Sequence, residues 1–533
     1  GGQRFVTAPL ALPEPGDAPP RHRLLTFGAI AFFVERARAV RHDFALDDDN
    51  APAVAEICRR LDGLPLAIEL AAAWVRVLTP TELLARLEPR LPLLHGGAAD
   101  QTARLQTMRD AIAWSYDLLS AEEARFFRQL AVFVGGFTLD AAEAVAGGGR
   151  REAEAVSEGV HSTFPDTRYP SPVTLDLLAG LIDKGLLQAA RDGRESRFGM
   201  LETVREFGLE QLAAAGEADE ARRHHALAMR DLAERAEPHL LGSQEREWHG
   251  RLDAELGNLR AALAWSLEHD LETALRIGAS LWVYWAWYRL PEGRRWLSAA
   301  ADRAEPGSVA DAVWLKAMMV DGALAALEGD GERCLASAGT ALALARAAGD
   351  EEAAARAGWI VACGHLVFAD FGAAAARLDE AFPAFTRAMT PVGLAWAGYA
   401  RSHRGAVALL LGDPAAGVAF YEEALAQLRR AGSDGLLLTA ISDFAGWLIE
   451  LGEAARARQM LREALTLAAS VSGVWLAGSA MMGLALVEAI DGDPAEAARR
   501  LAIFGHRSGV TARLGAIRAG RFSGGLDTYS TPQ

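Results

Sequence analysis

One chemical function can be excluded from the residue types alone. A phosphate-binding P-loop needs a Gly-Lys-Ser/Thr run, in which the lysine contacts the phosphates and the hydroxyl binds magnesium. The 533 residues contain only two lysines, Lys184 and Lys316, and these follow Asp183 and Leu315. The chain therefore contains no P-loop.

No other residues form a pattern typical of catalysis or metal binding. There is no Ser/His/Asp set, no paired-carboxylate arrangement and no metal-ligand spacing. His224 and His225 are adjacent, so on a helix their side chains point to different sides and do not easily share one ion. Cys58, Cys334 and Cys363 lie far apart within helical patterns, which predicts buried thiols in a reducing compartment. We expect no catalysis and no metal in this chain.

The length, hydropathy and charge of the chain limit its number of domains and the partners that it can have. A length of 533 residues indicates several domains. The most apolar window, Ile277 to Tyr288, is too short to span a bilayer, and no N-terminal signal pattern is present, so a cytoplasmic protein without membrane contact is expected. The net charge of −16 disfavours nucleic acid as the main partner. Because the sequence begins with Gly, we expect it to be part of a longer protein.

The most informative stretch is Gly63-Leu64-Pro65-Leu66-Ala67. Glycine releases the preceding helix, and proline is tolerated in the first turn of the next one because its missing N–H has no helical partner. The pattern predicts a rigid corner between two helices. By itself it is also compatible with an ordinary helix–helix corner.

The flanking residues add a family resemblance. Glu56 to Asp62 and Trp74 to Pro80 surround the corner in a way that resembles the GLPLA segment of STAND-type signalling ATPases, the NB-ARC or AP-ATPase group, as found in bacterial regulators. The resemblance implies that Gly63, Leu64 and Pro65 face a nucleotide. It also implies that ATP or ADP, with magnesium, is held by an upstream core in the intact protein, whereas this chain alone holds no cofactor.

The predicted fold class is mainly α, with a helical bundle, a winged helix containing a small β-hairpin, and an α-solenoid of tetratricopeptide-like helix pairs. The expected domains are a linker from the missing nucleotide-binding core (1–23), an NB-ARC-type lid bundle (24–100), a winged-helix domain (101–215) with a flexible insertion (147–172), helical repeats (216–508) and an irregular tail (509–533).

Several local signals support the winged helix. Ser120-Ala121-Glu122-Glu123 is a capping-box start for a helix through Phe133, and Asp192-Gly193 predicts a hairpin. The candidate recognition helix, Leu175 to Lys184, is poor in base-reading side chains, so direct nucleic-acid contact is not expected. Leu201 to Phe207 matches the position of the family's Met-His-Asp-like motif, but Leu201 replaces the histidine; a solvated helix N-terminus is the favoured interpretation.

The second half of the chain repeats. Gly412-Asp413, Gly452-Glu453 and Gly492-Asp493 recur at a step of 40 residues within a region that shows only helical patterns. A fixed period of this length is typical of stacked helix pairs that bury their faces against one another. The pattern resembles the longer tetratricopeptide-like repeats of STAND regulators.

One aromatic segment, Trp282 to Tyr288, falls within this region. Trp282, Trp285 and Tyr288 share a helical face at i, i+3 and i+6. They can form core between repeats, since aromatic residues dominate such cores. Alternatively, they form part of a ligand or peptide surface on the solenoid.

The family resemblance, together with these features, predicts the sensor and regulatory portion of an ATP-dependent STAND switch, a transcriptional regulator. Its repeats would bind a small ligand or a protein, its lid would contact an upstream nucleotide-binding core, and the activated protein could form an oligomer. Two alternatives stay open. One is a winged-helix DNA-binding transcription factor; the other is the regulatory half of an effector enzyme such as a nucleotide cyclase or kinase.

Overall fold

The computed structural model describes residues 9–13, 21–87, 90–91, 94, 107–147, 172–192, 195–241, 244–305, 307–387, 391–468 and 474–490. The chain divides into two compact units, residues 1–228 and 229–533. The predicted insertion (apart from its end residues 147 and 172), the predicted tail and most of the predicted linker lie outside the described residues.

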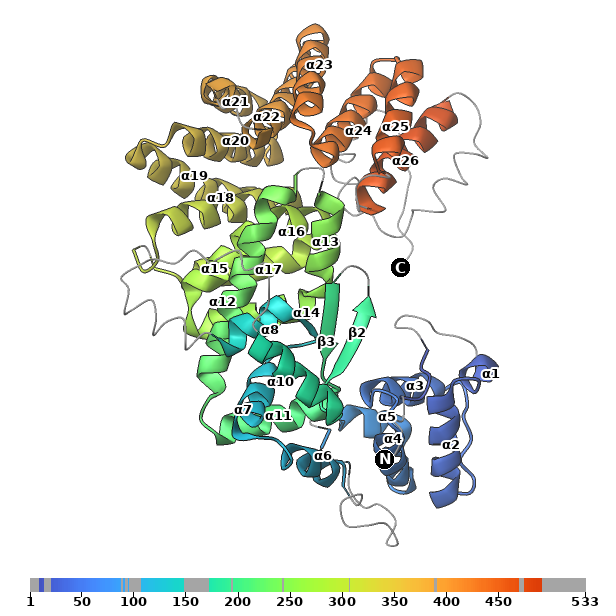
Figure 1. Ribbon diagram of the computed structural model, residues 1–533. Coiled ribbons are helices and arrows are strands. Elements are labelled where there is room, and N and C mark those ends of the chain that lie inside the picture. Colours follow the sequence, from blue (N-terminus) through green and yellow to red (C-terminus); the bar gives the residue numbers. More distant parts are fainter. Residues whose placement is uncertain are drawn as a thin grey trace. The chain divides into compact units, whose positions relative to one another are not determined.

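The first unit begins with a bundle of short helices (Figure 1). Thr79 and Glu82 form a capping box, in which each side chain accepts a hydrogen bond from the other residue's backbone N–H, and Pro80 occupies the first helical position. The helices are α1 (Arg21–Leu24), α2 (Gly28–Val40), α3 (Ala51–Arg60), α4 (Pro65–Ala73), the 3-10 helix η1 (Trp74–Arg76) and α5 (Pro80–Ala85).

The remainder of the first unit combines helices with one small sheet. The helices are α6 (Met108–Tyr116), α7 (Ala121–Leu130), α8 (Leu139–Ala146), α10 (Pro172–Asp183) and α11 (Glu202–Ala214). The predicted Ser120 capping box starts α7. However, α7 ends at Leu130, before Phe133. The Phe133 ring lies outside the helix and packs 4.7 Å from the ring of Phe137.

The predicted hairpin is present and gains a third strand. Strand β2 (Gln188–Asp192) pairs antiparallel with β3 (Glu195–Gly199), and β1 (Phe137–Thr138) pairs with the other edge of β3. The sequence analysis missed β1, which has only two residues. Gly136 makes this pairing possible, since its φ is 102° and a Cβ there would lie 2.9 Å from the Phe198 carbonyl oxygen.

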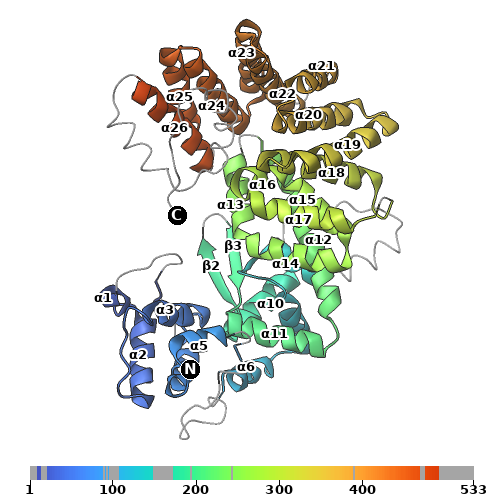
Figure 2. The same cartoon turned by 180° about the vertical axis from the view of Figure 1, so that it is seen from behind.

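The second unit consists of helices that pack successively on one another (Figures 1 and 2). Helix α12 (Ala218–Ala236) crosses from the first unit into it. The other elements are η3 (Glu237–His239), α13 (Glu245–Ala254), α14 (Leu256–His269), α15 (Leu271–Ser280), α16 (Trp282–Tyr288), α17 (Leu290–Arg303), α18 (Asp311–Glu328), α19 (Gly331–Ala348), α20 (Glu351–Val367), α21 (Phe371–Arg387), α22 (Pro391–Leu410), α23 (Pro414–Ala431), α24 (Asp434–Glu450), α25 (Ala454–Ala468) and α26 (Val474–Ile490).

The 40-residue period reflects the way these helices end and restart. Gly412 and Gly452 have φ values of 88° and 82°, a left-handed conformation that glycine adopts without steric cost. Asp413 then caps α23 by accepting a hydrogen bond from the Ala416 N–H. The third predicted break, at Gly492, lies outside the described residues.

Helices two positions apart in the chain also contact one another: α18 contacts α20, and α22 contacts α24. The helix pairs therefore stack into a layered array. The fold is therefore mainly α, with one small sheet, as the sequence predicts. Among the described helices, none combines the length and hydropathy needed to cross a bilayer.

Candidate functional site

The Gly-Leu-Pro corner has an unusual backbone path. Asp62 and Gly63 have φ values of 54° and 66°, so two successive residues are left-handed. Such a conformation is uncommon for any residue except glycine, although Asp tolerates it better than most. The Gly63 carbonyl accepts a hydrogen bond from the Leu10 N–H at 2.9 Å. A Cβ on Gly63 would lie only 2.4 Å from the Leu10 carbonyl oxygen. Residue 63 must therefore be glycine for the preceding segment to pack against the corner.

The polar backbone groups of the corner are already used within the protein. The Gly63 N–H donates to the Cys58 carbonyl, and the Leu64 N–H donates to the Leu61 carbonyl. Pro65 begins α4 and has no N–H. Since Leu64 and Pro65 are half-buried, the corner offers an apolar edge, and the bonded N–H groups of Gly63 and Leu64 are not available to a phosphate.

Asp62 joins the corner to the helix that follows the hairpin. Its carboxylate accepts a hydrogen bond from the Glu202 N–H at 2.8 Å, across 140 residues of sequence. Glu202 is the first residue of α11, and Leu201 before it provides no side-chain cap. Asp62 therefore supplies the cap that α11 lacks. Burial raises the pKa of Asp62, although this hydrogen bond acts in the opposite direction.

Charged side chains fix the same helix end. The Glu202 carboxylate lies 3.3 Å from the Arg90 guanidinium and also pairs with Arg205. Burial acts to raise the pKa of Glu202, but these two cations lower it overall. One turn later, Glu206 accepts hydrogen bonds from the N–H groups of Arg90 and Leu91.

These contacts correct one expectation. The sequence favoured a solvated N-terminus for the helix after the hairpin, whereas the structure fills this end with Asp62 and a cluster of ion pairs. No sequence signal could have identified Asp62, because its partner is 140 residues away. Arg205 holds Glu202 rather than projecting freely.

We expect Asp62→Gly to weaken the link between the corner and α11 without unfolding the first unit. Glycine accepts the left-handed backbone but removes the cap, which is worth about 1 kcal/mol. Hydrogen exchange of the first turn of α11 should therefore become roughly five- to tenfold faster. The matched control is Asp62→Asn, which keeps a carbonyl acceptor and should preserve most of the protection. Equal protection in Asp62→Gly and the wild type would contradict the assigned role.

The three aromatic residues predicted to share a face have different surroundings. Trp285 is fully buried, and its indole N–H donates to the Gly278 carbonyl at 3.1 Å. Trp282 is half-buried, with its ring 4.9 Å from that of Trp396 on α22. Tyr288 donates its hydroxyl hydrogen to Glu245 on α13. Trp285 is thus a core residue, as the inter-repeat interpretation requires, and only Trp282 and Tyr288 remain candidates for ligand contact.

Trp282 belongs to a larger aromatic layer. Trp359 on α20 lies 5.4 Å from Trp396 and 5.8 Å from Tyr399, ring to ring. The His403 ring stands edge-on to Tyr399 at 4.8 Å. Burial lowers the pKa of His403, so its imidazole is neutral at physiological pH. The layer consists of side chains from α16, α20 and α22 and can pack against apolar or aromatic groups.

A cluster of polar side chains lies next to the Tyr288 ring. The Tyr284 hydroxyl donates to Asp253 at 2.6 Å, and Arg289 contacts both groups. The His249 ring lies 3.9 Å from the Tyr288 ring. Within the described residues, no group of three or more His, Cys, Asp or Glu side chains is arranged to hold a metal ion. In this cluster, hydrogen bonds join Asp253 on α13 to Tyr284 on α16 and to Arg289, which directly follows α16.

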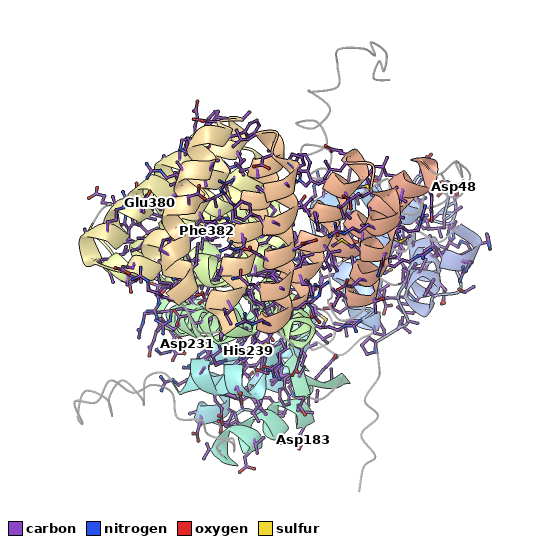
Figure 3. All side chains as sticks on the ribbon, turned by 90° about the horizontal axis from the view of Figure 1, so that it is seen from above. Asp48, Asp183, Asp231, His239, Glu380 and Phe382 are labelled. Atoms are coloured by element: carbon purple, nitrogen blue, oxygen red, sulfur yellow. The ribbon has the colours of Figure 1, made fainter. Side chains whose placement is uncertain are left out.

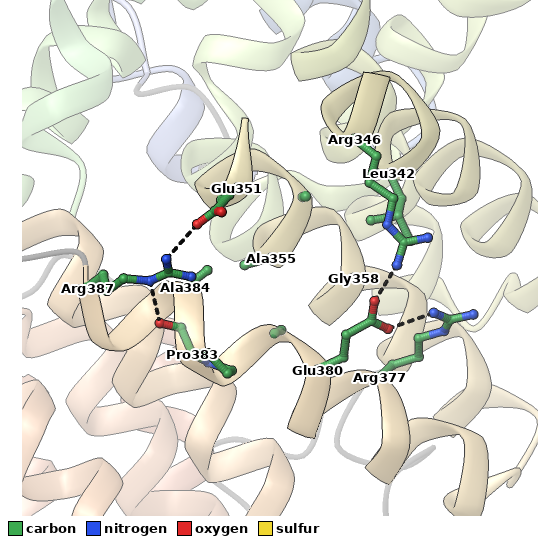
Figure 4. Close-up of a pocket in the computed structure, with 12 residues that line it drawn as sticks. Leu342, Arg346, Glu351, Ala355, Gly358, Arg377, Glu380, Pro383, Ala384 and Arg387 are labelled. Atoms are coloured by element: carbon green, nitrogen blue, oxygen red, sulfur yellow. Dashed lines mark hydrogen bonds and ion pairs between the residues drawn. The ribbon is translucent and has the colours of Figure 1, made fainter. Parts of the chain in front are cut away.

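A shallow cavity of about 190 Å³ lies between α19, α20 and α21 (Figure 4). Its floor is formed by small residues, such as Ala355 and Gly358, and its rim is charged. Arg377 on the rim pairs with Glu380 at 2.8 Å. Glu380 lies on α21, as does Phe382, and both residues are labelled in Figure 3. The rim arginines Arg346 and Arg377 share the carboxylate of Glu380, and Arg387 pairs with Glu351, so the lining carries three arginines against two carboxylates.

The chain is similar in sequence to several known proteins. No family model matches it. Over 348 residues it is 37% identical to proteins of Mycobacterium tuberculosis and Mycobacterium bovis that carry the name "Putative HTH-type transcriptional regulator". The match covers 64% of this chain and 37% of each relative, so the chain spans well under half the length of these relatives. An uncharacterized protein of Mycobacterium tuberculosis is 42% identical over 195 residues, which are 37% of this chain and 45% of that protein.

Solved structures give weaker similarities. A STAND protein with a tetratricopeptide repeat sensor from Pyrococcus horikoshii aligns with 89% of this chain and 71% of its own, at 12% identity and a TM-score of 0.39. Aspartyl phosphate phosphatase F from Bacillus subtilis aligns with 82% of this chain and 100% of its own, at 12% identity and a TM-score of 0.35.

Proposed function

We propose that this chain is the sensor and regulatory portion of a STAND-type, nucleotide-dependent regulator of transcription. The observation that carries the proposal is the hydrogen bond from the Glu202 N–H to Asp62, which connects the Gly-Leu-Pro corner to the helix after the hairpin. In the family that the sequence resembles, these are the two segments that meet the nucleotide. A change at one segment would be transmitted to the other through this contact.

The corner fits only part of the proposed nucleotide. Leu64 and Pro65 provide an apolar edge against which a base or ribose can pack, whereas the N–H groups of Gly63 and Leu64 are already bonded within the protein. The phosphates and magnesium would therefore be held by a P-loop domain outside this chain. ATP or ADP bound there would supply the chemical difference between two states; the residues of this chain would detect that difference.

The helical array is the proposed sensor. A ligand or protein partner that binds the array more tightly in one conformation would shift the population toward that conformation. The winged-helix assignment of the helices and sheet of residues 107–214 belongs to the same proposal, as do cytoplasmic location and oligomer formation on activation. We propose no catalytic step for this chain itself.

Direct DNA binding through the hairpin domain is the second candidate, because the mycobacterial relatives are named as HTH-type regulators. The structure gives it little support. The single lysine that follows the candidate recognition helix, Lys184, is bound to Glu123 at 2.6 Å. Val173 and Leu175 are exposed on α10, and neither can read a base edge by hydrogen bonding.

The test compares the complete protein encoded by the gene with this chain alone. We expect the complete protein to bind fluorescent ADP and this chain not to bind it. Pro65→Ala in the complete protein should weaken ADP binding about tenfold, equivalent to about 1.4 kcal/mol, by removing a rigid apolar contact. Absence of nucleotide binding by the complete protein would overturn the proposal. A specific mobility shift of duplex DNA by this chain alone would favour the second candidate instead.

A further inference from the structure

Helices from opposite ends of the array meet at one point. Trp287 on α16 lies against Gly435 on α24, so closely that a Cβ on Gly435 would be 2.5 Å from the indole ring. The same Cβ would lie 3.0 Å from a carboxylate oxygen of Glu245 on α13. Residues 245 and 435 are far apart in sequence, so this contact closes the array on itself. Glycine at position 435 is what permits the approach.

The closing contact contains a buried carboxyl group with few partners. Glu245 is only 3% exposed, and the Tyr288 hydroxyl donates a hydrogen bond to it at 3.1 Å. The hydroxyl of Ser433, which is 1% exposed, has no hydrogen-bond partner among the described residues. Asp434 at the start of α24 adds a like charge near Glu245. A charged carboxylate is therefore poorly accommodated here.

The surrounding groups do not supply a compensating cation. On α13, burial lowers the pKa of His249 despite the nearby Asp253, so the imidazole is neutral at physiological pH. Directly after α16, the Arg289 guanidinium is directed to Asp253 and to the Tyr284 hydroxyl. On α24, the titratable neighbour is Asp434. Burial and Asp434 thus favour the neutral form of Glu245 and outweigh the Tyr288 hydrogen bond, which favours the charged form.

We propose that Glu245, Tyr288, Trp287 and Gly435 form a reversible latch that closes the helical array while Glu245 carries a proton and opens when Glu245 loses it. The latch is independent of the nucleotide proposal, because every residue in it belongs to the second unit. Opening would separate α13 and α16 from the start of α24. It would uncover Trp287 and the adjoining part of the array, which are the surfaces that a partner could then reach.

The direction of the pH dependence follows from linkage. Burial raises the pKa of Glu245 from its ordinary 4.5 to about 7 in the closed array. An opened, hydrated Glu245 would titrate near the ordinary value. Protonation therefore favours the closed form; the closed population falls as the pH rises from 4.5 to about 7 and levels off above that. The ratio of closed to open forms should change by roughly three-hundredfold over this range, because the two pKa values differ by about 2.5.

The latch can be tested by hydrogen exchange of the whole chain at pH 5.5 and pH 8, corrected for the intrinsic exchange rates. In the wild type, peptides from α13, α16 and the first turns of α24 should lose protection as the pH rises. Peptides from α19 and α20, which are remote from the latch in sequence, should not. Glu245→Gln keeps a hydrogen-bond acceptor for Tyr288 without a titratable proton, so its protection should be independent of pH.

Two further variants keep the test decisive even if Glu245→Gln does not fold. Asp434→Asn removes the like charge that raises the pKa of Glu245, so the opening transition should shift to lower pH. A transition that stays where it is in the wild type, or that shifts to higher pH, would contradict the latch. Gly435→Ala should leave the latch peptides unprotected at both pH values, because the added methyl group collides with Trp287. Wild-type protection that does not change with pH, or a pH dependence that persists in Glu245→Gln, would overturn the inference.

Discussion

Replacement of Gly293 by alanine should destabilise the second unit by about 3 kcal/mol, near the upper end of the cost of overpacking a core. A Cβ at position 293 on α17 would lie 2.2 Å from Cβ and Cγ of Trp285. Trp285 cannot move aside readily, because it is fully buried and its indole N–H is bonded to the Gly278 carbonyl. Urea unfolding followed by circular dichroism should show the loss, and hydrogen exchange should locate it in α15, α16 and α17.

The matched control is Gly339→Ala on α19. A Cβ at Gly339 meets no atom within 4 Å. Alanine there should be neutral or stabilising by about 0.5–1 kcal/mol, because it restricts the unfolded chain and favours the helix. If Gly293→Ala were as stable as this control, Trp285 would not be packed as the structure shows.

Gly63→Ala should have the second largest effect, about 3 kcal/mol on the first unit. One part, about 1–2 kcal/mol, comes from placing a side chain on a left-handed backbone with a φ of 66°. The rest comes from the collision with the Leu10 carbonyl oxygen, 2.4 Å from the new Cβ. Hydrogen exchange of α2, α3 and α4 should increase, and proteases should cleave near residues 9–13 more rapidly.

Gly216→Ala separates these two contributions. Gly216 has a φ of 71°, close to that of Gly63, but a Cβ there meets no atom within 4 Å. It should therefore cost only the strain of about 1–2 kcal/mol. Equal losses in the two variants would mean that the Leu10 segment is not pressed against the corner, and would remove the structural reason for a glycine at that point.

The interaction of Asp62 with α11 gives the proposed switch a physical form. Asp62 lies beside the corner glycine, on a backbone that only a short polar residue or glycine tolerates well. Its carboxylate holds the N-terminus of α11. A displacement of the corner by a fraction of the length of this hydrogen bond would therefore be transmitted to the N-terminus of α11. The proposed latch at Glu245 lies in the second unit, so the two can be varied independently.

Features that depend on a few consecutive residues were determined by the sequence. The capping box at Ser120, the hairpin of β2 and β3 and the glycine breaks at Gly412 and Gly452 all appear where the local pattern predicts them. Their physical cause is local, since a cap or a left-handed glycine satisfies backbone groups within one turn of itself. The mainly helical fold follows from the same signals repeated along the chain.

Tertiary structure decided which of these elements meet. Trp282, Trp285 and Tyr288 share one helical face, yet one packs on α22, one is buried against α17 and one binds a carboxylate on α13. The contacts of Asp62 with Glu202 and of Glu245 with α24 join residues more than one hundred positions apart. A periodic pattern states which side of a helix is apolar; the identity of the neighbour depends on how the whole chain packs, which no local signal contains.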